Sequence, residues 1–334
     1  MKKFVSRLAT AAVIAVITAS VTAIAVAQYT EPRPLPEAVI PEFLPYGGEN
    51  VERAISVSPN VNLNVCVTEG KLSVNGWRRN EVRIFVHNGN KFNFKVLEKT
   101  TDEKPVWISA FSHVTRGKTT VVSECLRGEN VEIDLPVGAT LNLKGKSIET
   151  SIDTLKRLSV EIVGGDVSVR NVSAGIKARV FQGGITVEES KGPLSLETTI
   201  GNIVVFEAGP SEIGDVFQAK TNSGAISLQR VLHKQLDVSS ISGSMLFTGD
   251  ILSGASYSFS TSNGSIRLAL PLNSAFQVAA TYGFGNFASD LPIKILTEND
   301  KEGPLRSIVA NIGAGGDALL KLTTNSGLIG IRKQ

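Results

Sequence analysis

The stretch that decides the fold reads Thr221-Asn222-Ser223-Gly224-Ala225-Ile226-Ser227-Leu228. A glycine is followed by two apolar side chains with one residue between them, and hydroxyl or amide residues precede it. This glycine phrase occurs seven times, and its glycines are Gly165, Gly183, Gly201, Gly224, Gly243, Gly264 and Gly327. Successive glycines lie 18, 18, 23, 19, 21 and 63 residues apart. A repeated unit of about 20 residues that holds short strands is typical of a stacked β-repeat.

The chain before these repeats alternates apolar and polar residues with a period of two, as at residues 61–65, 82–86 and 131–135. This alternation predicts half-buried strands. We therefore expect an all-β fold, a repetitive β-solenoid resembling a parallel β-helix, with a less regular N-terminal strand region. The alternative is an antiparallel β-meander or sandwich, in which Asn263-Gly264 would form a hairpin turn. The near-constant spacing of one strand phrase favours the solenoid.

The residue types of the repeat have a physical reason in a solenoid. Glycine adopts a positive φ without strain, so we expect Gly224 and Gly264 at such corners. Hydroxyl and amide residues before the glycines, such as Thr261-Ser262-Asn263, would stack along one edge. We interpret them as a structural ladder, with glycan binding as the alternative. Because the final repeat ends near the C-terminus, we also expect the last coil to expose a strand edge.

The N-terminus indicates export. Basic residues are followed by an uncharged run at residues 8–27, which closes with Ala25-Val26-Ala27, a pattern typical of signal-peptidase cleavage. We predict a signal peptide at residues 1–27, and a mature protein in the periplasm or at the cell surface. An uncleaved membrane anchor is the alternative, and it also leaves the domain outside the cytoplasm.

Three further segments follow the predicted signal peptide. Residues 28–50 contain five prolines and are assigned to a linker, because proline fixes φ and lacks a backbone donor. Residues 51–160 form the predicted N-terminal β region. Residues 161–334 form the β-repeat region, and we expect both regions to belong to one continuous stack.

Charge excludes nucleic acid as a partner. The chain has 34 basic and 31 acidic side chains, and three of the basic ones lie in the predicted signal peptide. The remainder is therefore neutral, and no basic cluster with interleaved aromatic residues occurs. Cys66 and Cys125 are the only cysteines. They form a disulfide in an oxidising compartment or remain two buried thiols, because the sequence does not supply the Cα separation.

No motif for catalysis or metal binding is found. His87, His113 and His233 each stand alone, without cysteine or carboxylate partners at metal-ligand spacing. No nucleophile motif is present, and the acidic residues look scattered. Aspartates that follow glycines, such as Asp166 and Asp317, are interpreted as turn residues rather than calcium ligands. We expect no catalytic residue, no metal site and no cofactor.

Three segments carry a family resemblance. They are residues 69–82, which contain Asn75-Gly76-Trp77-Arg78, residues 284–292, and the closing Thr324-Asn325-Ser326-Gly327-Leu328-Ile329. Together they resemble an adhesin-like family of bacterial envelope proteins over roughly residues 51–333. Arg78 departs from the acidic or amide residue expected after the tryptophan. The resemblance implies a β-solenoid and a surface-binding role.

The predicted function is that of an exported, non-catalytic envelope protein. It would act as an adhesin-like surface scaffold or binding module, with envelope proteins or glycans as partners and the membrane only through an uncleaved N-terminal segment. The alternative is a β-helix carbohydrate-active enzyme, a polysaccharide lyase or hydrolase. Such an enzyme needs two or three acidic residues that converge on one face of adjacent coils.

Overall fold

The computed structural model describes residues 48–116, 119–301 and 306–334. The predicted signal peptide at residues 1–27 and nearly all of the predicted linker at residues 28–50 lie outside this part of the chain. Every regular element in the described ranges is a β-strand. Within the same ranges there is no helix of the length and apolar character needed to cross a membrane.

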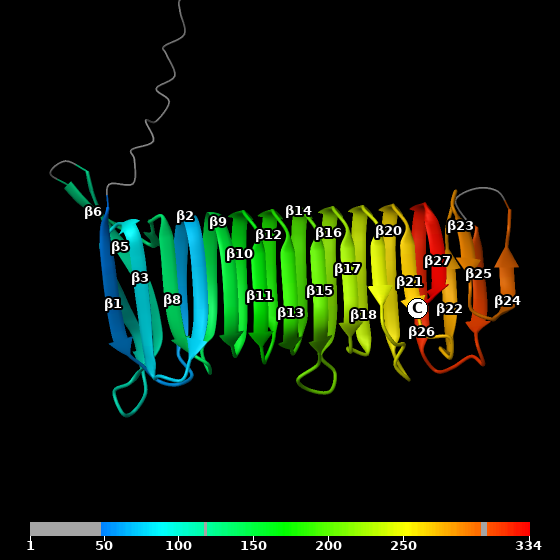
Figure 1. Cartoon of the computed structure of the whole chain (residues 1–334), viewed down its shortest axis with the longest axis horizontal. Helices are drawn as coiled ribbons and strands as arrows, with labels where there is room; N and C mark the ends of the chain where they lie inside the picture. Colours follow the sequence, from blue (N-terminus) through cyan, green and yellow to red (C-terminus); the bar gives the residue numbers. More distant parts are fainter. Residues whose placement is uncertain (1–47, 117–118, 302–305) are drawn as a thin grey trace, which may run out of the picture. The chain divides into compact units, whose positions relative to one another are not determined.

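Two ladders of parallel strands make up most of the fold (Figure 1). The first ladder contains, in spatial order, β9 (Thr140–Leu155), β10 (Arg157–Gly164), β12 (Ile176–Gln182), β14 (Leu194–Ile200), β16 (Val216–Ser223), β18 (Gln235–Ser242), β20 (Ser256–Asn263), β26 (Leu319–Ser326) and β22 (Phe276–Thr281). The second ladder continues from the end of β9 through β11 (Val167–Val172), β13 (Ile185–Lys191), β15 (Ile203–Gly209), β17 (Ile226–Val231), β19 (Met245–Thr248), β21 (Ile266–Leu270), β27 (Leu328–Lys333) and β23 (Asn286–Ser289).

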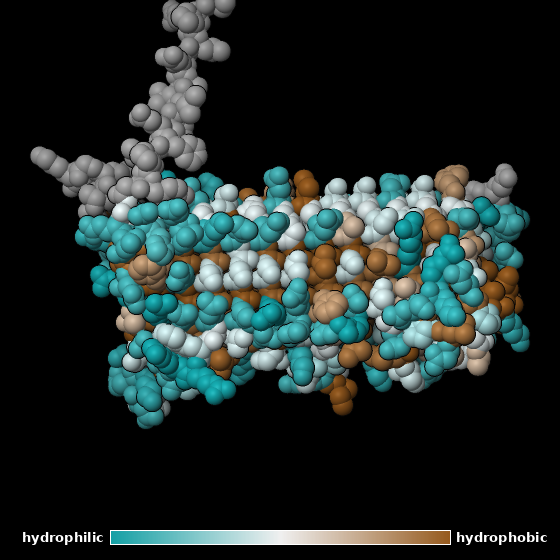
Figure 2. Space-filling model, viewed as in Figure 1, coloured by the Kyte–Doolittle hydropathy of each residue, from teal (hydrophilic) through white to brown (hydrophobic). Residues whose placement is uncertain are grey.

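Each coil supplies one strand to each ladder, so the fold is a β-solenoid. Inward side chains stack in register along the ladders and form one continuous core. In the second ladder one such column contains Ile185, Ile203, Ile226, Met245, Ile266 and Ile329. Side chains of similar hydropathy accordingly line up in rows along the long axis of the stack (Figure 2). A coil buries its apolar side chains only between neighbouring coils, which explains why the phrase is repeated.

The antiparallel alternative is wrong. Asn263 and Gly264 do not form a hairpin turn but the corner between β20 in the first ladder and β21 in the second. The backbone N–H of Gly264 donates to the carbonyl of Ser326 in the adjacent coil, at 3.0 Å. The polar residues before the glycine therefore serve a corner that is hydrogen-bonded between coils.

The N-terminal strands are less regular than the repeats. They are β1 (Glu49–Ser56), β2 (Asn62–Trp77), β3 (Glu81–Gly89), β4 (Phe92–Lys99), β5 (Pro105–Arg116), β6 (Thr119–Ser123), β7 (Cys125–Leu126) and β8 (Asn130–Pro136). Strand β2 pairs in parallel with β9 over most of its length and so begins both ladders. Antiparallel pairs β1–β3, β3–β8, β4–β5 and β5–β6 close this end of the stack.

The C-terminal strands are threaded out of order. Strands β26 and β27 lie between the β20/β21 coil and the β22/β23 coil, as the red strands in Figure 1 show. The expectation that the last coil in the sequence exposes an edge is therefore wrong. The 63-residue interval between Gly264 and Gly327 holds β22, β23, β24 (Ile293–Asn299) and β25 (Ser307–Ile312). Strand β25 pairs antiparallel with β22, and β24 pairs antiparallel with β25, so these two strands end the stack.

The repeated glycines form a column at one corner, but a positive φ is not what all of them share. Gly224 has a φ of +154°, whereas Gly243 and Gly264 have no positive φ, so the expectation for Gly264 is wrong. What recurs is close contact between coils. From Gly183 to Gly327, a Cβ on each glycine of the repeat would lie 1.8–2.2 Å from the carbonyl oxygen of the preceding one. A side chain does not fit there, because the backbones of neighbouring coils touch.

Candidate binding groove

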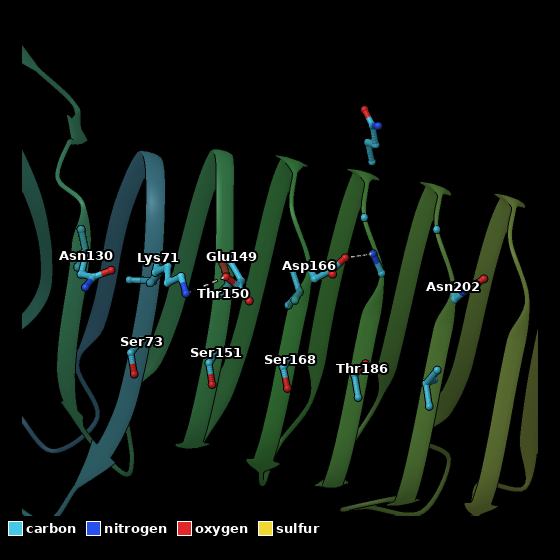
Figure 3. A pocket seen from close by; sticks show the side chains of 18 of the residues that line it. Lys71, Ser73, Asn130, Glu149, Thr150, Ser151, Asp166, Ser168, Thr186 and Asn202 are labelled. Carbon is cyan, nitrogen blue, oxygen red and sulfur yellow. Dashed lines mark hydrogen bonds and ion pairs between the residues drawn. The ribbon is translucent and has the colours of Figure 1, made fainter. Parts of the chain in front are cut away.

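A groove of about 890 Å³ crosses the outer surface of the second ladder and its N-terminal extension. It runs across the strands, from β8 and β2 over β9, β11 and β13 to the start of β15 (Figure 3). We call it the hydroxyl groove, after the four side chains Ser73, Ser151, Ser168 and Thr186 that lie along it. Its long direction therefore follows the axis of the solenoid rather than any one strand.

The four hydroxyl residues occupy one register position. Ser73 pairs with Ser151, Ser151 with Ser168, and Ser168 with Thr186. Each points outward, because its neighbours along the strand, such as Val167 and Val169, are buried. Neighbouring strands in a sheet lie about 4.7–4.9 Å apart, so the hydroxyls form a regularly spaced row. Within the described chain, none of these four hydroxyls makes a hydrogen bond.

An inward row of hydroxyls provides the contrast. Thr198, Thr221, Ser240, Thr261 and Thr324 are buried, and each donates to a carbonyl of the glycine column at 2.8–3.4 Å. These residues begin the polar triplets before the glycines, and they form the structural ladder expected from the sequence. The remaining members of the triplets, such as Asn222 and Ser223, are exposed. The buried row is satisfied internally, and the outward row in the groove is not.

Polar side chains at the corner form one rim of the groove. The Asp166 carboxylate accepts a hydrogen bond from the Gly184 N–H at 2.7 Å, and the Asn202 amide oxygen accepts one from the Ala225 N–H at 2.8 Å. Each of these side chains thus bridges to the next coil. The sequence interpretation of Asp166 as a turn residue agrees with this contact. Near the other end, Lys71 and Glu149 form an exposed ion pair at 3.6 Å, which contributes little to stability.

Three carboxylates line this single groove, which corrects the view that the acidic residues are scattered. They are Glu132 on β8, Glu149 on β9 and Asp166 before β11. Each has a partner, since Glu132 lies 3.8 Å from the His87 ring and Glu149 and Asp166 make the contacts described above. The sequence did not reveal this convergence, because it depends on the pairing of β8 with β2 and of β2 with β9.

One buried polar atom underlies the groove. The Thr150 side chain lines it and is almost fully buried, and its hydroxyl has no hydrogen-bond partner in the described chain. An unsatisfied buried hydroxyl is costly to the fold. Thr150 therefore marks a place where the groove retains unused hydrogen-bonding capacity.

The histidines do not converge. His87 lies on β3, His113 lies on β5 beside Asn93, and His233 is buried between β17 and β18. Among the described residues, no group of three or more histidine, cysteine or acidic side chains could hold a metal ion. The His233 ring lies 2.8 Å from the Gly192 carbonyl oxygen, and burial lowers the pKa of His233 below its usual range.

The two cysteines lie opposite each other on β2 and β7, in parallel register. The structure joins Cys66 to Cys125 by a disulfide, with a Cα–Cα distance of 4.3 Å. This bridge ties the irregular N-terminal strands to the first coil of the stack. It does not line the hydroxyl groove.

Comparison with known proteins gives a family. No curated protein matches the chain. A solved structure titled "putative cell adhesion protein", from Clostridium sporogenes, has 12% identity and a TM-score of 0.26, and the match covers 86% of this chain and 100% of that one. A second, titled "putative adhesin", from Bacteroides fragilis, has 12% identity and a TM-score of 0.36, covering 86% of this chain and 97% of that one. The model of the Toastrack DUF4097 family matches residues 48–332, and the chain belongs to this family.

Proposed function

We propose that this protein is an exported, non-catalytic surface-binding module, and that its hydroxyl groove holds an extended glycan. The observation that carries the proposal is the row of Ser73, Ser151, Ser168 and Thr186, four hydroxyls in register that no other part of the described chain uses. The buried hydroxyls of the same coils are all engaged with the glycine column. The outward row is therefore not required for the fold in the way that the inward row is.

The chemistry of the groove suits a carbohydrate chain. A serine or threonine hydroxyl both donates and accepts hydrogen bonds, as sugar hydroxyls do. Glu132 and Glu149 add acceptors, and Lys71 adds a donor. An extended glycan presents its hydroxyls at regular intervals, and the groove repeats its own once per coil. Because the groove is built on strands of a packed stack, little conformational entropy is lost on binding.

Two features support a location outside the cytoplasm. The first 27 residues have the pattern of a secretory signal. A disulfide between Cys66 and Cys125 persists in an oxidising compartment and is rare in the cytosol. The protein would thus meet cell-envelope glycans where it folds.

The test is binding of purified protein to a panel of cell-envelope polysaccharides, measured by isothermal titration calorimetry. The triple variant Ser151→Ala, Ser168→Ala, Thr186→Val should bind about tenfold or more weakly, because three hydrogen bonds to the ligand are lost. The matched control is Ser239→Ala, Ser258→Ala, Ser260→Ala, which removes three half-buried hydroxyls of the first ladder that line none of the grooves described. Equal binding by both triple variants would contradict the assignment of the groove.

A polysaccharide lyase or hydrolase is the second candidate, because Glu132, Glu149 and Asp166 line the same groove. The two functions differ in their products. Incubation with each polysaccharide that binds, followed by assay for new reducing ends and unsaturated sugars, should give no turnover. Under the binding proposal, single Glu132→Gln, Glu149→Gln and Asp166→Asn variants should each retain binding. Turnover that is abolished by one of these substitutions would establish the enzyme instead.

A further inference from the structure

One strand edge at the C-terminal end of the stack carries no partner in the described chain. Strand β24 pairs antiparallel with β25, and no other described strand pairs with it. Strand β25 lies between β22 and β24, so β24 is the outermost strand of the first ladder. An exposed strand edge presents a row of backbone N–H and C=O groups that a further strand can pair with.

The side chains of β24 are unusually apolar for such a position. Ile293, Ile295 and Leu296 are 38%, 48% and 51% exposed. Figure 2 shows apolar side chains gathered on this end of the stack, at the right of the view. The second ladder ends at β23, which pairs with β27, so β24 has no strand of that ladder beside it. The coil thus leaves both an edge and an apolar surface uncovered.

The charges on β24 specify what can cover it. The strand contains one base, Lys294, and one acid, Glu298, and neither pairs with an opposite charge in the described chain. They lie symmetrically about Leu296, two residues to either side. The register shift against β25 leaves Leu296 opposite no residue of that strand. Opposite charges directly across an antiparallel pair are stabilising, and like charges are destabilising.

We propose that β24 pairs antiparallel with β24 of a second copy of this chain, about a two-fold axis at Leu296. This register places Lys294 of each copy opposite Glu298 of the other, so the symmetric pair contains two ion pairs. It also places Ile295 opposite Thr297 and Leu296 opposite Leu296. Shifting the antiparallel register separates the opposite charges, and a parallel pairing in register sets like charges side by side.

The proposed interface closes on itself. Because each copy uses the same strand, the interface is isologous and yields a dimer rather than a fibre. The hydroxyl groove lies on the N-terminal half of the stack, and β24 lies at the other end, so two grooves would remain accessible. The dimer would present them on a doubled solenoid, which raises avidity for a long polymer. This inference does not depend on the identity of the ligand.

Sedimentation velocity of the purified protein tests the pairing. The wild-type protein should dimerise, and Lys294→Glu and Glu298→Lys should each raise the dimer dissociation constant by about tenfold or more, because each creates two like-charge contacts. The double variant Lys294→Glu, Glu298→Lys should restore dimerisation. Lys321→Glu is the matched control, because Lys321 is an exposed lysine on β26 whose register partners are Ser258 and Ala279.

Crosslinking tests the register independently. Residues directly opposite in an antiparallel pair have Cα atoms about 4.5–5.5 Å apart, within the range for a disulfide. Leu296→Cys should therefore form a covalent dimer on mild oxidation, whereas Ile293→Cys should not, since two copies of residue 293 lie far apart along the strands. A wild-type protein that stays monomeric, a double variant no better than the single ones, or equal crosslinking by both cysteine variants would overturn the proposal.

Discussion

At the scale of single residues, close approach of backbones explains the repeated glycines better than their dihedral angles do. Gly243 has no positive φ, yet a Cβ there would lie 1.8 Å from the Gly224 carbonyl oxygen. The sequence predicted a corner at each glycine but not the reason for it. The spacing of the phrase reveals a repeat, whereas the distance between coils follows only from stacking them. This is why the expectation for Gly264 was wrong although its position was correct.

We predict that Gly243→Ala lowers the free energy of unfolding by about 1–3 kcal/mol or more, because the new methyl group forces two coils apart. The control is Gly209→Ala, where a Cβ would meet nothing closer than the Leu232 side chain at 3.8 Å. Urea denaturation followed by circular dichroism measures both. Similar losses for the two variants would contradict the stacking explanation.

A second residue-scale prediction concerns pH. Burial lowers the pKa of His233, although its hydrogen bond with Gly192 and the nearby Asp215 carboxylate act in the opposite direction. Between the ordinary pKa of 6.5 and the lowered one, the unfolded chain binds a proton that the folded chain does not. Stability should therefore fall as pH drops below about 6.5.

The measurement is the midpoint of thermal unfolding between pH 7.5 and 5. His233→Gln preserves a donor to the Gly192 carbonyl and removes the titrating group, so its midpoint should depend less on pH over this range. The wild-type and variant proteins should converge as the pH is lowered. A pH dependence that is identical in the two proteins would show that other groups cause it.

At the scale of elements, the sequence predicted the strands and their parallel stacking well, because inward positions repeat apolar residues in every coil. It did not predict the order of the strands at the C-terminus. Strands β26 and β27 carry the same glycine phrase as their neighbours, and nothing in that phrase indicates that they enter the stack between β21 and β23. The three carboxylates of the groove escaped notice for the same reason, since strand pairing brings them together.

The threading makes a prediction about truncation. Removal of residues 319–334, which contain β26 and β27, should abolish cooperative folding or lower the melting temperature strongly, because it leaves a gap in the middle of both ladders. Replacing residues 293–312, which contain β24 and β25, with a flexible linker removes only strands at the end of the stack and should be tolerated better. A C-terminal truncation as stable as the full chain would contradict this threading.

At the scale of the whole molecule, the stack converts a local repeat into a surface with one chemical character along its length. Inward hydroxyls hold the coils together through the glycine column, and outward hydroxyls at a different register position line the groove. The sequence contained both sets but did not separate them, because burial depends on which way each strand faces. The family places this chain among Toastrack proteins, and the groove supplies a specific site for the surface role that we propose.

Hydrogen–deuterium exchange with mass spectrometry tests the central claim most directly, with and without the polysaccharide that binds best. We predict slower exchange on binding in peptides from β2, β9, β11 and β13, which carry Ser73, Ser151, Ser168 and Thr186. Peptides from β16, β18 and β20 of the first ladder should be unchanged. Protection confined to the first ladder or to β24, with none along the hydroxyl groove, would contradict the account.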